Sequence, residues 1–97
     1  MIHRIGTSTY LADSCTFICG ADEVKLTPRE AALFAFLLAH KNEIVTRESI
    51  LDEIWGKSDY FAGRSMDVYI YRLRKHLEQD KAIKLHSIRS LGFRLEG

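Results

Sequence analysis

The chain has 97 residues, of which 46% are hydrophobic and 28% are charged, and its formal net charge is +1. A chain of this length is expected to form one domain whose core needs neither disulfides nor metal ions. No apolar run approaches the roughly 18 residues of a membrane helix, and the N-terminal residues lack a signal-peptide pattern. Cys15 and Cys19 are too few and too close in sequence to predict a disulfide or a zinc site. We expect both to be reduced and partly buried, which favours a cytoplasmic location.

The charge is unevenly distributed along the chain. Residues 1–63 carry six Lys/Arg against nine Asp/Glu, whereas residues 64–97 carry eight against four. The net charges of −3 and +4 concentrate the cationic surface in the last third of the sequence. Such a basic segment is the electrostatic pattern expected of a domain that binds nucleic acid.

The first 26 residues predict a small antiparallel sheet. Short apolar or β-branched runs alternate with turn clusters rich in Gly, Ser, Thr and Asp. Four strands of this length need a helix to cover one face of the sheet. The predicted strands are Ile2–Ile5, Tyr10–Ala12, Thr16–Cys19 and Glu23–Leu26.

A first helix is predicted from Pro28 to about Lys41. Thr27 supplies an N-cap, Pro28 stands at the first helical position, and Glu30 completes a capping box. Asn42 can adopt the left-handed conformation that ends a helix. The side chains expected in the core are Leu33, Phe34, Leu37 and Leu38.

A short strand and a second helix follow. Residues 43–46 predict one bridging strand, and Thr46 caps a helix from Arg47 to about Trp55. The segment from Gly56 to Gly63 breaks the periodicity and predicts a loop, with Phe61 anchoring it in the core. Together with the helix after it, this is a helix-turn-helix arrangement.

The stretch from Arg64 to Leu77 predicts a helix with two different faces. An apolar stripe at helical spacing indicates the core side: Met66, Ile70, Leu73 and Leu77. A mixed, cationic face is formed by Ser65, Val68, Tyr69, Arg72 and His76. By itself this pattern also fits a solvated surface helix. A helix with this cationic face suits the DNA major groove, where arginine can bind a guanine edge.

A basic hairpin is predicted directly after this helix. Residues 83–88 and 93–95 form its strands, and Arg89 lies near the turn. A hairpin arginine can reach phosphates or a narrow minor groove. The helix and the hairpin together favour DNA binding over a solvated surface; the orientation of Arg94 stays undecided.

From Leu26 onward, the sequence resembles the winged-helix effector domain of OmpR/PhoB-type response regulators. The matching segments open and close the helices and form the hairpin: Leu26-Thr27-Pro28-Arg29-Glu30, Val45-Thr46-Arg47-Glu48, Trp55-Gly56, Arg64-Ser65-Met66-Asp67-Val68-Tyr69-Ile70 with Arg72-Leu73-Arg74-Lys75, and Ile88-Arg89 with Gly92-Phe93. The first 26 residues match by pattern only. The resemblance implies a single α+β winged helix-turn-helix domain. Its parts would be a four-stranded platform (1–26), three helices (27–78) with recognition helix 64–77, and a wing (83–95).

The resemblance also implies roles for individual residues. Base edges would be contacted by Ser65, Val68, Tyr69 and Arg72. Phosphates would be held by Arg47, Trp55, Arg64, Arg74 and Lys75, and the wing would add Ser87 and Arg89. For Trp55, a purely core role and a core role with a DNA-facing indole N–H both remain open. The segment that faces RNA polymerase in activators of this family corresponds to Lys57, Ser58, Asp59 and Tyr60.

Two positions depart from the family pattern. Tyr71 stands where many members have an arginine, so one phosphate contact is missing or is replaced by a hydroxyl. Ser90 replaces the first glycine of the usual wing turn, which puts a left-handed backbone there in doubt. The receiver domain that normally precedes this domain is absent from the sequence, which is compatible with an excised effector domain and with a stand-alone regulator.

The resemblance implies several partners. They are double-stranded DNA, bound as direct repeats, RNA polymerase, and the receiver domain of a full-length protein. The isolated domain is expected to be monomeric off DNA. The alternative is a winged-helix module that uses the same helix to bind another protein, as the near-neutral charge and Tyr69 and Tyr71 suggest. No metal, cofactor or enzyme motif is visible, so we expect neither cofactor nor catalysis.

Overall fold

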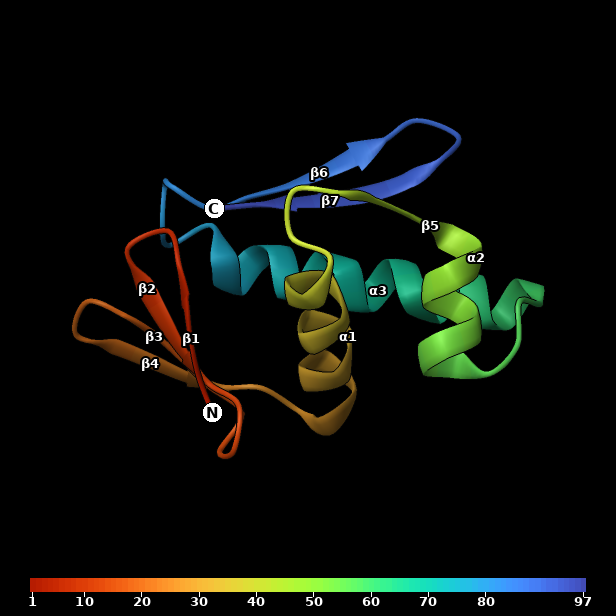
Figure 1. The fold of residues 1–97 in the computed structure, drawn as a ribbon. Helices are drawn as coiled ribbons and strands as arrows, with labels where there is room; N and C mark the ends of the chain where they lie inside the picture. Colours follow the sequence, from red (N-terminus) through yellow and green to blue (C-terminus); the bar gives the residue numbers. More distant parts are fainter.

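The N-terminal residues form the predicted sheet in the computed structural model, which describes residues 1–97 (Figure 1). Four antiparallel strands follow one another in chain order: β1 (Ile2–Ile5), β2 (Ser8–Leu11), β3 (Thr16–Cys19) and β4 (Asp22–Lys25). All four expected strands are present, with ends shifted by at most two residues. One face of the sheet buries Ile5, Tyr10 and Phe17, and burial raises the pKa of Tyr10 to about 12.

Helix α1 (Pro28–Ala39) covers that buried face of the sheet. The Phe34 ring lies 4.7 Å from the Tyr10 ring and 6.1 Å from the Phe17 ring, centroid to centroid. The predicted capping box is present, because Thr27 Oγ1 accepts from the Glu30 N–H while Glu30 Oε1 accepts from the Thr27 N–H. The helix ends two residues before the predicted Lys41. Asn42 has the expected left-handed conformation, with φ 69°.

The second helix is present over its predicted length but is not α-helical throughout. After β5 (Ile44–Thr46), Thr46 caps α2 (Arg47–Ile50), which continues as a π-helical segment, η1 (Leu51–Trp55). Gly56 ends the segment with φ 72°. π-helical turns are not visible in apolar periodicity, so the sequence predicted an ordinary helix here.

Helix α3 (Tyr60–Leu77) begins four residues before the predicted Arg64. The side chain of Asp59 accepts a hydrogen bond from the Ala62 N–H at 2.8 Å and caps the helix. The loop prediction was therefore wrong for residues 60–63. Phe61 does not anchor a loop either, because its side chain is 77% exposed and Ala62 occupies the buried position instead. The four predicted core positions of α3, from Met66 to Leu77, are all buried.

The C-terminal hairpin forms the wing and extends the fold above the helices (Figure 1). Strands β6 (Lys84–Ile88) and β7 (Gly92–Glu96) pair with each other, and β7 also pairs with β5. A side chain at Gly92 would overlap the carbonyl oxygen of Val45 on β5, so this contact requires glycine. Ser90 in the turn has φ 65°, and the left-handed backbone is thus present without the usual glycine. None of the helices combines the length and apolar character needed to cross a bilayer.

Candidate nucleic-acid interface

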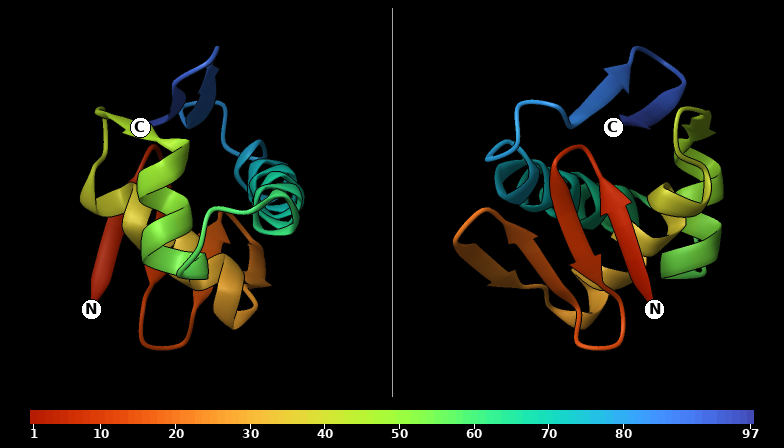
Figure 2. Two further views of the ribbon diagram at one scale, coloured as in Figure 1. Left: turned by 90° about the vertical axis from the view of Figure 1, so that its right-hand side faces the viewer. Right: turned by 60° about the vertical axis from the view of Figure 1, so that its left-hand side comes forward.

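The outer side of α3 carries a continuous exposed stripe. The left view of Figure 2 looks along this helix and shows that one side of it faces no other element. The exposed side chains recur every three or four residues and include three cations: Arg64, Val68, Tyr71, Arg72 and Lys75. Val68 is 47% exposed and Tyr71 59% exposed, so apolar groups are also available on this surface. Tyr71, for which the sequence left open a missing phosphate contact or a hydroxyl contact in its place, lies within the stripe.

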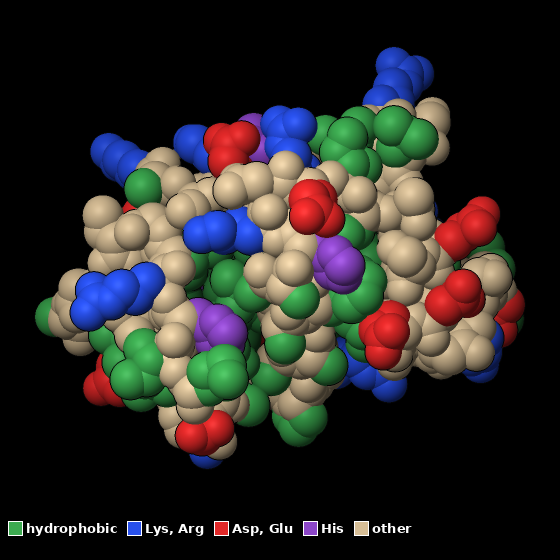
Figure 3. All heavy atoms as spheres, in the orientation of Figure 1, with side chains coloured by type: hydrophobic (Ala, Val, Ile, Leu, Met, Phe, Trp, Pro, Cys, Tyr) green, Lys and Arg blue, Asp and Glu red, His purple; other side chains and the backbone are tan.

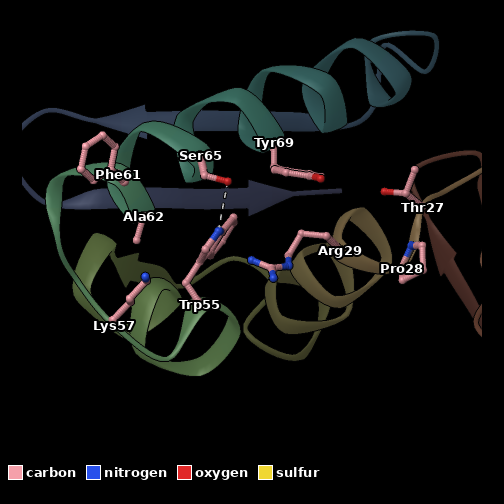
Figure 4. Close-up of a pocket in the computed structure, with 9 residues that line it drawn as sticks. All are labelled: Thr27, Pro28, Arg29, Trp55, Lys57, Phe61, Ala62, Ser65 and Tyr69. Carbon is pink, nitrogen blue, oxygen red and sulfur yellow. Dashed lines mark hydrogen bonds between the residues drawn. The ribbon is translucent and has the colours of Figure 1, made fainter.

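Two of the expected base-contacting residues lie at one edge of the stripe rather than at its centre. Ser65 and Tyr69 are half-buried, and both contact Trp55 of η1; Figure 4 shows the two side chains on the edge of α3 that borders the groove. The indole N–H of Trp55 donates to Ser65 Oγ at 3.1 Å. The Trp55 and Tyr69 rings meet edge to face with centroids 5.9 Å apart. In the unbound protein the indole N–H is therefore used within the domain.

Arg72 and Lys75 extend from the exposed stripe over aromatic rings. The Arg72 guanidinium carbon lies 5.2 Å from the Tyr69 ring centroid, and the Lys75 Nζ lies 5.6 Å from that of Tyr71. Lys75 also lies 3.5 Å from a carboxylate oxygen of Glu78. Arg72 has no carboxylate partner, so its guanidinium donors are free to bind an external acceptor.

At the other edge of α3, basic side chains tie the helix to its neighbours. Arg47 of α2 forms an ion pair with Asp67 at 2.8 Å. Arg74 donates through Nε and Nη2 to the carbonyl oxygen of Leu85 on β6, at 3.1 and 2.8 Å, and through Nη2 to Ser87 Oγ at 2.9 Å. Three expected DNA contacts, Arg47, Arg74 and Ser87, thus have partners inside the domain, and Arg74 joins the wing to α3.

The turn of the wing presents an unpaired cation. Arg89 is exposed and forms no ion pair, and a basic side chain projects beyond the body of the protein at the hairpin turn (Figure 3). The same view shows acidic side chains gathered on the side where α2 lies.

The loop between η1 and α3 is short, because α3 starts at Tyr60. Lys57 lies 3.6 Å from the carboxylate of Asp59. The hydrogen bond from the Ala62 N–H lowers the pKa of Asp59, with a further contribution from Lys57. Tyr60 is 69% exposed and its ring meets that of Phe61 with centroids 5.4 Å apart. Of the four residues expected to face a polymerase, only Lys57 and Ser58 lie wholly in the loop, since Asp59 caps α3 and Tyr60 begins it.

A groove runs between α3 and the N-terminal end of α1 (Figure 4). Its lining comes from the N-terminal end of α1, from η1 and the loop after it, and from α3: Thr27, Pro28, Arg29, Trp55, Lys57, Phe61, Ala62, Ser65 and Tyr69. The Arg29 guanidinium carbon lies 4.8 Å from the centroid of the Trp55 ring. Sequence reasoning matched Arg29 to the family pattern but gave it no role, because its position beside Trp55 depends on how α1 and η1 pack.

The interface offers cations, hydroxyls and aromatic rings. No group of three or more His, Cys, Asp or Glu side chains is arranged to hold a metal ion. The chemistry on this surface is the binding of anions and of hydrogen-bonding edges, which matches the backbone and the bases of a nucleic acid.

Comparison with known proteins identifies related domains. The family described as "Transcriptional regulatory protein, C terminal" matches residues 21–95. The transcriptional regulatory protein RprY of Bacteroides fragilis is 40% identical over 94 residues, which cover 97% of this chain and 40% of RprY. The chain thus spans about two fifths of the length of this curated relative.

Two solved structures show the same arrangement of elements. The DNA-binding domain of Klebsiella pneumoniae RstA, in complex with the RstA box, superimposes with a TM-score of 0.82 and is 26% identical; the match covers 98% of this chain and 96% of that one. The response regulator DrrB of Thermotoga maritima, an OmpR/PhoB homolog, has a TM-score of 0.81 and 24% identity, with 99% and 44% coverage. The expected α+β winged helix-turn-helix fold is confirmed.

Proposed function

Because the chain belongs to the OmpR/PhoB-type family of transcriptional regulatory proteins, we propose that α3 and the wing together bind a specific double-stranded DNA sequence. The family consists of transcription regulator domains and not of enzymes. In this chain the function is DNA binding by the effector domain of a response regulator.

The exposed stripe of α3 is the observation that carries this proposal. An α-helix with its side chains is about 10–12 Å across, which matches the major groove width of about 12 Å. Val68 and Arg72 lie on the stripe, with Arg72 unpaired and able to donate to a guanine edge. Ser65 and Tyr69 at the edge would reach bases on one side of the groove.

The residues proposed to contact phosphates differ in whether they already have a partner inside the domain. Arg64 extends from the stripe and Arg89 from the wing, and neither has an ion-pair partner, so both can bind a phosphate without losing one. Lys75 would have to exchange its contact with Glu78 for the phosphate. The guanidinium groups of Arg47 and Arg74 each have a partner inside the domain already, so a phosphate would have to share or displace these contacts. To bind a phosphate, the indole N–H of Trp55 would have to give up its hydrogen bond to Ser65. We therefore propose that the main role of Trp55 is to position Ser65.

The remaining partners belong to the full-length protein. The relative RprY is more than twice as long as this chain, and we propose that a receiver domain precedes the effector domain here. Two copies would bind direct repeats with centres about 10–10.5 bp apart, and the free domain would be a monomer. Contact with RNA polymerase would involve the loop at Lys57 and Ser58, and the site of action would be the cytoplasm.

A protein-binding module is the second candidate function. The observation that favours it is the exposed aromatic pair Tyr60 and Phe61, which no other element covers. A module that binds only protein would show weak salt dependence and no preference among DNA sequences. DNA binding would instead weaken by about 0.9 log units per log unit of salt for each phosphate neutralised.

Substitutions on α3 test the DNA proposal. Arg72→Ala is expected to cost about 1–3 kcal/mol on the preferred site and to relax sequence preference, because a base contact is lost. Lys75→Ala should weaken binding to all sequences alike, because a phosphate contact is lost. Sites selected from a randomised DNA pool, followed by competition binding, measure both effects. An Arg72→Ala protein with unchanged affinity and preference would refute the recognition role of α3.

A further inference from the structure

Arg29 is the one half-buried arginine without an internal acceptor. Four arginines are half-buried, and three of them bind within the domain: Arg47 to Asp67, Arg74 to Leu85 and Ser87, and Arg94 to Glu96. The Arg29 guanidinium has neither a hydrogen bond nor an ion pair, and its neighbour in the adjoining hollow, Glu53, lies beyond ion-pair distance. None of its nitrogen atoms is among the buried polar atoms that lack a partner, so its N–H groups remain accessible from outside the protein. An external acceptor can therefore reach donors that no group of the domain uses.

The position of Arg29 in α1 is also unfavourable by itself. Arg29 is the second residue of the helix, where the macrodipole disfavours a cation. Glu30 does not neutralise it, because Glu30 Oε1 accepts from the Thr27 N–H and Oε2 faces His76 Nε2 at 3.5 Å. An anion bound beside Arg29 would interact favourably with both the guanidinium and the end of α1.

The surroundings hold the guanidinium at the groove. Its carbon lies 4.8 Å from the Trp55 ring centroid, and the hydrogen bond from the indole N–H to Ser65 fixes that ring. Figure 4 shows Arg29 extending toward Trp55, between α1 and the edge of α3 formed by Ser65 and Tyr69. Arg29 is therefore presented beside α3 with its donors unfilled.

We propose that this groove binds a backbone phosphate of the DNA and that Arg29 donates the hydrogen bonds to it. A helix that fills the major groove has one phosphate strand along each of its edges. On one edge of α3 the wing offers Arg89; on the opposite edge the groove offers Arg29. Lys57 lines the groove as well, but Asp59 partly neutralises it. This inference rests on the proposed docking of α3 in the major groove.

Arg29→Ala tests the proposal, with Arg4→Ala as the matched control. Arg4 is an exposed arginine on β1, away from the groove, so both variants lose one positive charge. Arg29→Ala should weaken binding to specific and nonspecific DNA alike, by about three- to tenfold at physiological salt, and should lower the salt slope by about 0.9. Arg4→Ala should leave the slope unchanged. Thermal stability should change little, because the contact with the Trp55 ring is lost while an unfavourable cation is removed from the first turn of α1.

A DNA probe locates the phosphate itself. Neutral methylphosphonates placed one at a time along the site should reveal one position, on the strand opposite the wing, that weakens the wild type but not Arg29→Ala. If Arg29→Ala matches Arg4→Ala in affinity and slope, the groove does not bind a phosphate. In that case Arg72→Ala would still relax sequence preference if α3 reads the bases. If the wild type shows no salt-dependent DNA binding at all, the proposed function fails as well.

Discussion

Ser90 holds the turn of the wing in a conformation that disfavours its side chain. Its φ of 65° lies in the left-handed region, and its hydroxyl makes no hydrogen bond that would compensate. Left-handed backbone costs an L-residue with a Cβ roughly 1–2 kcal/mol relative to the right-handed form. The turn is therefore held by the pairing of β6 with β7, not by local preference.

Replacing Ser90 by glycine should stabilise the domain. Glycine removes the backbone strain, but it also has a larger conformational entropy in the unfolded state. The net effect predicts an increase of about 0.5–1 kcal/mol in the free energy of unfolding. Urea unfolding with a fluorescence or circular dichroism readout measures it.

Gly56 provides the opposite control for this prediction. It has φ 72°, and a Cβ added there would meet no heavy atom within 4 Å, so Gly56→Ala adds backbone strain without a clash. That variant should lose about 1 kcal/mol. A lower unfolding midpoint for Ser90→Gly would show that the turn does not have this conformation in solution.

At the scale of elements, Arg74 connects the recognition helix to the wing. The two donors that reach the Leu85 carbonyl oxygen and the one that reaches Ser87 join α3 to β6 across eleven and thirteen residues of sequence. If α3 fills the major groove, this contact sets where the wing meets the DNA. Arg74 is then a positioning residue for Arg89.

Arg74→Met should loosen the contact between the wing and α3. Loss of the hydrogen bonds predicts a loss of about 1–2 kcal/mol in the free energy of unfolding. In DNA binding, Arg89→Ala should cost less in the Arg74→Met background than in the wild type, because the wing is no longer held in place. A double-mutant cycle with a site of fixed sequence measures this coupling. The control is Arg94→Met, which removes a half-buried arginine paired with Glu96 and should leave the loss of DNA affinity from Arg89→Ala unchanged. If the losses of affinity from Arg74→Met and Arg89→Ala are strictly additive, Arg74 does not position the wing.

Element boundaries were predictable where their signals are local. The capping box of Thr27 and Glu30 acts over three residues, and α1 begins where the sequence placed it. Asp59 caps α3 in the same way, but the exposed Tyr60 and Phe61 gave no periodicity to support an early start. Phe61 was predicted to lie in the core because it is a large apolar side chain, but it lies on the exposed side of the first turn of α3. The contacts of Arg74 with β6 and of Arg29 with Trp55 depend on how the elements pack, so they cannot be predicted from local patterns in a single sequence.

At the scale of the whole molecule, Asp80 joins the N-terminal sheet to the end of α3. No local sequence signal indicates this contact, because its partners are more than seventy residues apart. Asp80 Oδ2 accepts from the Thr7 N–H at 2.8 Å, Thr7 Oγ1 at 3.0 Å and Ser8 Oγ at 2.6 Å, and Oδ1 accepts from the Ala82 N–H at 2.9 Å. The residue is 4% exposed. Three platform donors on one buried carboxylate thus fix the sheet to the end of α3, and the Ala82 N–H holds the carboxylate from its own loop.

The pH dependence of this contact has a definite sign. Burial raises the pKa of Asp80, but the hydrogen bonds from Ser8, Ala82 and Thr7 outweigh it, so the pKa lies below the ordinary value of 3.8. A carboxyl group whose pKa is lowered by folding stabilises the native state above its unfolded pKa. That stability is lost as the pH falls through the lower, folded pKa.

Asp80→Asn should therefore destabilise the domain at neutral pH much more than in acid. The amide cannot accept from all four donors, which predicts a loss of about 1–3 kcal/mol at pH 7. As the pH falls below 3.8 and then through the lower pKa of the native state, the wild-type carboxyl becomes protonated and the difference between the two proteins should shrink. Urea unfolding at a series of pH values measures the difference, and Asp13→Asn, at an exposed carboxylate, supplies the control. A difference that stays constant into strong acid would mean that the ionised form of Asp80 does not hold the platform to the core.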